Sequence, residues 1–133
     1  MRKPRAILVM GLGFCGAIST VDAASAQISL PATRSPDGAA LFKQQCATCH
    51  TTSVSDAPRQ GPPLVQIIGR QAGKIEGFHY SPGLAQAGFT WDEDKLDAWL
   101  TDPQAVIPGA IMAYRQAKAE TRAAIIIYLK GLN

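Results

Sequence analysis

Apolar side chains recur at helical spacing from residue 39 onward. Ala39, Phe42 and Cys46 lie three and four positions apart, so a helix through them would place all three on one face. Ser35 is suited to cap this helix, with Pro36 at its first position and an acidic residue in its first turn. The pattern predicts a helix from residue 35 whose buried face continues beyond Cys46.

Two further helices are predicted in the second half of the chain. Thr90 and Glu93 form a capping-box pattern at the start of one, and Pro103 ends it. The other runs from about residue 116 to residue 130, and Gly131 is suited to its C-terminal cap. Apolar residues at helical spacing form the inner faces: Leu96, Trp99 and Leu100 in the first helix, and Ile125, Tyr128 and Leu129 in the second.

The remaining segments are rich in proline, glycine and small polar residues, which is typical of loops. Within them, residues 64–70 show a short helical pattern, with Leu64, Ile67 and Ile68 on the apolar side. The pattern contains no persuasive strand alternation and no internal repeat, so the predicted fold class is all-α, with three main helices plus short ones. Such a domain has a thin hydrophobic core, which a large apolar cofactor at the centre would complete.

The N-terminus has the layout of a secretory signal peptide. Basic residues within positions 1–5 precede an apolar run over positions 6–20, and Ala24-Ser25-Ala26 offers a small-residue cleavage site. We expect residues 1–26 to be the signal peptide and residues 27–133 to be the mature domain. The apolar run is shorter than the roughly 18–20 residues that span a bilayer, so an uncleaved anchor is the weaker alternative.

Cleavage changes the charge and the cysteine count. It removes three of the 13 basic and one of the 10 acidic residues, which leaves a nearly neutral chain without a nucleic-acid footprint. It also removes Cys15, and the bulky Phe14 before this cysteine argues against a lipid-attachment site. The side chains that could still attach haem or bind iron are two cysteines, two histidines and one methionine.

Cys46-Ala47-Thr48-Cys49-His50 is a C-x-x-C-H sequence, the attachment signature of c-type haem. Two thiols three residues apart on a helical turn can reach the two vinyl groups of one porphyrin and form thioethers. The adjacent His50 then places an imidazole nitrogen beside the iron. We therefore predict one haem c, covalently bound through Cys46 and Cys49, with His50 as an iron ligand.

Three other interpretations of this motif are weaker. A zinc site needs a second pair of ligands, and the mature chain offers only His79 besides the motif. A thioredoxin-like redox motif needs a βαβ context, which the pattern does not predict. A disulfide across so short a helical turn would be strained and would leave His50 without a role.

Met112 is the candidate for the sixth iron ligand. It is the one methionine of the mature chain, and it follows Pro108-Gly109 in a loop between two predicted helices. A lone methionine is usually core filler, but the haem motif favours ligation here. A His/Met pair raises the reduction potential relative to a bis-histidine pair. It also occupies both faces of the iron, which favours electron transfer over catalysis. His79 is the alternative ligand, although its glycine-rich loop indicates a position at the surface or rim.

From residue 37 to residue 130 the chain resembles class I cytochromes c, the soluble bacterial relatives of mitochondrial cytochrome c. The resemblance lies in the haem motif, in the Pro108-Gly109 to Met112 loop, and in Gly38 and Phe42, which look like the family's helix-packing pair. It implies that the pair meets the last helix. It also implies the class I fold, with three main helices plus short ones wrapped around one covalently bound haem.

The resemblance implies roles for residues outside the motif as well. The carbonyl of Pro62 would accept the proton of His50 and fix its ring. Arg70, Tyr80 and Trp91 occupy positions that in the family hold a haem propionate, since a buried carboxylate needs a cation and hydrogen-bond donors. Taken alone, these residues could be an ordinary turn, a solvated charge and core aromatics.

Some positions depart from the family pattern. Trp99 stands where the family usually has a tyrosine near the methionine sulfur, and an indole cannot replace a phenol as acceptor. Gln44, Gln45 and Gln104 lie where many relatives are basic. A weakly charged docking face makes encounter less sensitive to salt. We expect docking through an apolar patch formed by Ile107, Ala110, Ile111 and Ala113.

The predicted function is that of a periplasmic single-electron carrier with His/Met ligation, and not of an enzyme. The implied partners are a cytochrome bc complex, a terminal oxidase or a periplasmic dehydrogenase. The carrier is expected to be a monomer, without nucleic-acid binding and without stable membrane insertion after cleavage. A dedicated cytochrome subunit of a periplasmic dehydrogenase complex is the alternative. A haem enzyme or gas sensor with an open iron position is a third reading, against which Met112 argues.

Overall fold

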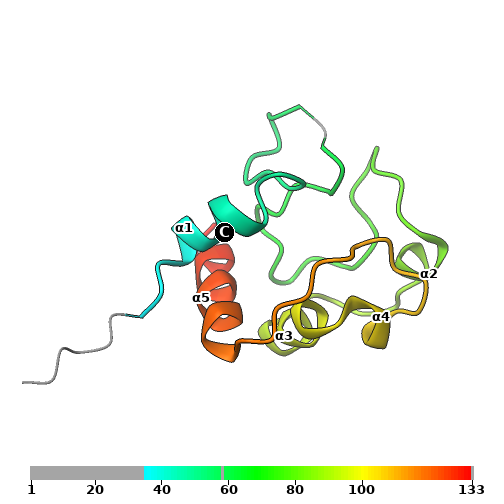
Figure 1. Ribbon diagram of the computed structural model, residues 1–133. Coiled ribbons are helices and arrows are strands. Elements are labelled where there is room, and N and C mark those ends of the chain that lie inside the picture. Colours follow the sequence, from blue (N-terminus) through cyan, green and yellow to red (C-terminus); the bar gives the residue numbers. More distant parts are fainter. Residues whose placement is uncertain (1–34, 58, 133) are drawn as a thin grey trace, which may run out of the picture. The chain divides into compact units, whose positions relative to one another are not determined.

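The computed structural model describes residues 35–57 and 59–132, so the predicted signal peptide lies outside the described residues. Five helices are connected by long irregular segments (Figure 1). The bounds are α1 (Gly38–Gln45), α2 (Pro82–Ala85), α3 (Glu93–Thr101), α4 (Pro103–Val106) and α5 (Ala119–Lys130). In the described part, the only β-type pairing is one isolated bridge between Gln71 and Thr90. The predicted all-α class, with three longer helices and short ones, is confirmed.

None of the helices in residues 35–57 and 59–132 has both the length and the apolar character needed to cross a membrane.

Helix α1 begins later and ends earlier than the sequence pattern indicates. Asp37, not Ser35, is the N-cap, because its carboxylate accepts from the backbone N–H groups of Ala39 at 3.0 Å and Ala40 at 3.3 Å. The helix ends at Gln45, and the chain continues in a turn in which the His50 N–H donates to the Cys46 carbonyl at 2.9 Å. The haem motif therefore lies in the turn that follows α1 rather than within the helix.

Helices α1 and α5 pack against each other (Figure 1). The rings of Phe42 and Tyr128 are 5.4 Å apart, and Ile125 of α5 is fully buried. Gly38 lies so close to α5 that a Cβ atom there would be 2.9 Å from the Tyr128 Cβ and still closer to the Ala124 carbonyl oxygen. The predicted packing of Gly38 and Phe42 against the last helix is confirmed.

Helix α5 begins at Ala119, three residues later than predicted. The preceding Gln116 uses its backbone elsewhere: its N–H donates to the Leu100 carbonyl at 2.8 Å, and its carbonyl accepts from Arg122 at 3.0 Å. These bonds tie the segment before α5 to the end of α3 and to the first turn of α5.

Helix α3 has the predicted buried residues but a different cap. Leu96, Trp99 and Leu100 are all buried. Asp92 is the N-cap and accepts from the Lys95 N–H at 2.6 Å. The predicted capping box at Thr90 is wrong, since Thr90 pairs with Gln71 in the β-bridge.

Pro103 ends α3 as expected and also begins α4, which the sequence pattern missed. The Asp102 carboxylate accepts from the Gln104 N–H at 3.0 Å, so a single acidic residue separates the two helices and caps the second.

The predicted short helix over residues 64–70 is wrong. Gln66 has φ of 54° and Gly69 has φ of 83°, and such left-handed positions break a right-handed helix. This segment instead runs beside the chain before α3, with the Gly69 N–H donating to the Trp91 carbonyl at 2.8 Å. Ile67 is nevertheless buried, as its apolar character indicates.

We predict that Gly38→Ala destabilises the haem-loaded protein by about 1–3 kcal/mol, because the added methyl group overlaps the α5 backbone. Denaturant unfolding measures the change. Gly88→Ala is the matched control, since nothing lies within 4 Å of a Cβ there. Its effect should stay within about 0.5 kcal/mol. Equal effects at both positions would contradict the close α1–α5 contact.

Candidate functional site

A cavity of ≈ 450 Å³ lies between the cysteine turn, the irregular segments and helices α3 and α5. The volume is typical of cofactor sites, and the lining is mostly apolar with a few polar groups. Its lining includes all nine of the residues that the sequence singles out: Cys46, Cys49, His50, Pro62, Arg70, Tyr80, Trp91, Trp99 and Met112. The fold thus brings together positions that span 67 residues of sequence, from 46 to 112.

The two thiols sit at the start of the turn that enters the cavity. Cys46 is buried, and the partly buried Cys49 donates through Sγ to the Gln60 side-chain oxygen at 3.2 Å. Burial raises the pKa of Cys46 to about 11, and the nearby Cys49 adds to the effect. Before haem attachment, Cys46 is therefore a protonated thiol at neutral pH, without the lowered pKa of a redox-active cysteine.

The His50 ring is held in one orientation. Its Nδ1–H donates to the Pro62 carbonyl at 2.8 Å, which leaves the Nε2 lone pair free to bind a metal. Burial lowers the pKa of His50, and the hydrogen bond to Pro62 opposes part of this effect. The neutral imidazole is the form that binds iron.

Gly61 is what allows this ring position. A Cβ atom on Gly61 would be 2.9 Å from His50 Nε2 and closer still to Cε1 and Nδ1 of the same ring. The chain therefore passes flat against the imidazole, and its next residue presents the accepting carbonyl. The sequence singles out Pro62 through the family resemblance, but the need for glycine at position 61 becomes visible only in three dimensions.

Met112 lines the same cavity on the segment between α4 and α5. The indole N–H of Trp99 donates to Met112 Sδ at 3.1 Å. Trp99 itself is buried in α3, where its ring packs edge-on against Trp91 at 5.4 Å. The indole thus acts as a hydrogen-bond donor to the thioether sulfur, which is the one role that a tryptophan N–H permits.

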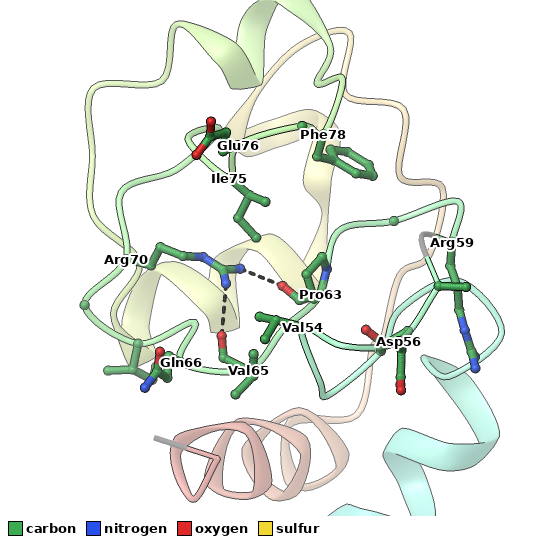
Figure 2. Close-up of a pocket in the computed structure, with 16 residues that line it drawn as sticks. Val54, Asp56, Arg59, Pro63, Val65, Gln66, Arg70, Ile75, Glu76 and Phe78 are labelled. Atoms are coloured by element: carbon green, nitrogen blue, oxygen red, sulfur yellow. Dashed lines mark hydrogen bonds between the residues drawn. The ribbon is translucent and has the colours of Figure 1, made fainter.

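Arg70 is a partly buried cation whose bonds go to backbone. Its Nη1 donates to the Val65 carbonyl and its Nη2 to the Pro63 carbonyl, both at 3.0 Å (Figure 2). Burial lowers the pKa of Arg70, and the same cause raises the pKa of the nearby Tyr80. Among the described residues, no carboxylate pairs with Arg70. A charged guanidinium without an acidic partner suits a cofactor that carries carboxylates.

A second cavity, of ≈ 660 Å³, also has Arg70 in its lining (Figure 2). It is the larger of the two, but its described lining contains no cysteine, histidine or methionine. Acidic and basic side chains balance there: Asp56 and Glu76 against Arg59 and Arg70. The two cysteines, His50 and Met112 line the smaller cavity and not this one.

The structure also corrects the surface around the site. Ile107 and Ala110 are buried, so the predicted apolar docking patch is reduced to the exposed Ile111 and Ala113. Ile111 is 78% exposed, and it also lines the cavity. His79, the alternative ligand, is an exposed residue of the cavity lining.

Comparison with known proteins matches most of this chain to one family. The family model described as cytochrome c matches residues 35–133. Cytochrome c of Gibberella zeae is 40% identical over 94 residues, which cover 70% of this chain and 89% of the relative. Cytochrome c2 of Rhodomicrobium vannielii is 39% identical over 93 residues, covering 69% and 74%. Cytochrome c of Ginkgo biloba is 37% identical over 94 residues, covering 70% and 83%.

We predict that Gly61→Ala loosens the His50 ring in the haem-loaded protein. The added methyl group overlaps the imidazole, so the hydrogen bond to Pro62 must lengthen or break. Hydrogen exchange of the His50 Nδ1–H, followed by NMR in the reduced state, should become roughly tenfold faster or more. Gly88→Ala is again the control. Unchanged exchange in Gly61→Ala would show that the ring has room that the structure does not indicate.

Proposed function

Since this chain belongs to the cytochrome c family, as a class I c-type cytochrome with one haem c covalently bound through Cys46 and Cys49, we propose that it is a periplasmic single-electron carrier with His50 and Met112 as axial ligands. Electron transport with a covalent haem is the general function of the family. The periplasmic location and the His50/Met112 ligand pair are not given by the family match and rest on separate arguments.

One observation carries the ligand assignment. His50 and Met112 are 62 positions apart in sequence, come from segments on either side of α3 in the chain, and line one cavity with both cysteines. Each side chain also has a hydrogen-bond partner that leaves a lone pair available: the Pro62 carbonyl bonds His50 at Nδ1 and leaves Nε2 free, and the Trp99 N–H bonds Met112 at Sδ, which keeps a second lone pair.

These contacts support a carrier more than a catalyst. The bound haem supplies one-electron chemistry at its iron. The Pro62 carbonyl raises the basicity of His50 and fixes its ring, while Trp99 fixes the Met112 thioether. Ligands that are held in place on both sides move little when the charge changes, and they leave no position for a substrate. In this proposal Arg70, Tyr80 and Trp91, which all line the cavity, hold a haem propionate.

The periplasmic assignment rests on the signal-peptide pattern of residues 1–26, which lie outside the described residues. In this proposal the mature carrier exchanges electrons with a cytochrome bc complex, a terminal oxidase or a periplasmic dehydrogenase.

The exposed Ile111 favours a second candidate function. An apolar side chain that is 78% exposed at the cavity rim suits a lasting interface, so the chain would be a dedicated subunit of a periplasmic dehydrogenase complex. Co-purification from the native source separates the two: a free carrier elutes alone, and a subunit elutes with a second polypeptide.

We predict that the oxidised wild-type protein shows the weak far-red sulfur-to-iron band and that the reduced protein has a sharp low-spin spectrum. Met112→Leu conserves volume but removes the sulfur, so the band should disappear and the reduced protein should bind carbon monoxide. His79→Leu is the matched control and should keep the band. An oxidised wild type without the band would contradict Met112 as the ligand, and a change to a high-spin spectrum in His79→Leu would then identify His79 instead.

Trp99→Phe tests the hydrogen bond at the sulfur. A donor at Met112 Sδ withdraws electron density and disfavours the oxidised iron, so its loss should lower the reduction potential by roughly 20–60 mV, the equivalent of one hydrogen bond. Phe89→Leu is the control, because Phe89 packs edge-on against Trp91 without offering a donor. An equal shift in both variants would attribute the effect to altered packing.

A further inference from the structure

We propose that Gln45, Gln104 and Tyr114 are positioning residues, which fasten the segment that carries Met112 and thereby set how fast Met112 gives way to an external ligand. The proposal rests on Met112 as the sixth iron ligand.

The segment around Met112 has little backbone support of its own. Within the described residues, positions 111–115 make no backbone–backbone hydrogen bonds, and Ile111 is 78% exposed. The ion pair of Arg115 with Asp102, at 2.9 Å, is solvent-exposed and contributes little. Segments of this kind open locally at low cost unless side chains restrain them.

Gln104 restrains the segment before Met112. Its side-chain oxygen accepts from the Gly109 N–H at 3.0 Å, and its side-chain N–H donates to the Ala110 carbonyl. The Gln104 side chain starts from a well-fixed backbone, because the Gln104 backbone N–H donates to the Asp102 carboxylate and the adjacent Pro103 is fully buried. One amide therefore clamps the turn that ends two residues before Met112.

Tyr114 and Gln45 restrain the segment after Met112. The Tyr114 hydroxyl donates to the Gln45 side-chain oxygen, which also accepts from Gln116 Nε2 at 3.1 Å. Gln116 Nε2 contacts the Tyr114 hydroxyl at 3.3 Å as well. Gln45 is the last residue of α1, directly before Cys46, so these bonds tie the Met112 segment to the chain that carries the haem attachment.

The hydrogen bonds of Gln104 and those between Gln45 and Tyr114 restrain the chain on either side of Met112. When an external ligand replaces Met112, the thioether must leave the iron and its segment must move, which breaks one or both sets of hydrogen bonds. The rate of this opening then depends on side chains that never touch the iron.

The test is imidazole binding to the oxidised holoprotein at saturating imidazole, where the limiting rate reports the opening of Met112. Tyr114→Phe removes only the hydroxyl, and Gln104→Glu keeps the acceptor but loses the donor. We expect the limiting rate to rise roughly fivefold in Tyr114→Phe and roughly tenfold in Gln104→Glu, with the far-red band retained in both.

Two matched variants serve as controls. Tyr128→Phe removes a hydroxyl, and Gln44→Glu makes the same charge change in α1. Neither side chain makes a hydrogen bond among the described residues, and neither lines the cavity. Their limiting rates should stay within about twofold of wild type. Denaturant unfolding of all four variants shows whether rate and global stability change together.

The outcomes are distinct. A far-red band in the wild type with unchanged rates in Tyr114→Phe and Gln104→Glu overturns this inference and leaves the proposed ligand pair intact. The inference is also overturned if the limiting rates of all four variants, controls included, simply follow their free energies of unfolding. The effect would then be general unfolding. A wild type without the far-red band removes Met112 as ligand, and both proposals fail together.

Discussion

The structure depends on a central cavity that must be filled. A void of ≈ 450 Å³ lined by side chains such as Ile67, Leu96 and Ile125 would forfeit the dispersion contacts that normally stabilise a core. The covalently bound haem therefore belongs to the hydrophobic core as much as to the chemistry. This explains why short helices and long irregular segments suffice, because the cofactor supplies much of the apolar surface against which they pack.

Irregular backbone is also what builds the polar part of the site. A helix uses its carbonyls internally, whereas the segment around residues 62–65 has carbonyls to spare. Pro62 uses one to orient His50, and Pro63 and Val65 use theirs to hold Arg70. Proline favours this arrangement, since it offers an acceptor but no donor that would need its own partner. The predicted helix over residues 64–70 would have used the Val65 carbonyl internally, whereas in the observed turns this carbonyl holds Arg70.

The sequence predicts the fold class, the inner faces of the longer helices and the haem motif, because these signals are local and periodic. It does not predict which of several neighbouring polar residues caps a helix. The N-caps are Asp37 and Asp92, and not the predicted Ser35 and Thr90. Nor does it reveal α4 or the left-handed Gln66. The hydrogen bond from His50 to Pro62 and the place of Arg70 in the cavity lining are expected only from the family resemblance. The bond between Gln45 and Tyr114 joins residues 69 positions apart, and no pattern along the chain indicates it.

The way Arg70 is held has a consequence for acid tolerance. Its hydrogen-bond partners are peptide carbonyls, which do not titrate, whereas an aspartate or glutamate partner would lose its charge in acid. The phenol of Tyr80, whose pKa burial raises, is uncharged over the same range. The cation at this end of the cavity therefore keeps both its charge and its hydrogen bonds while surface carboxylates become protonated.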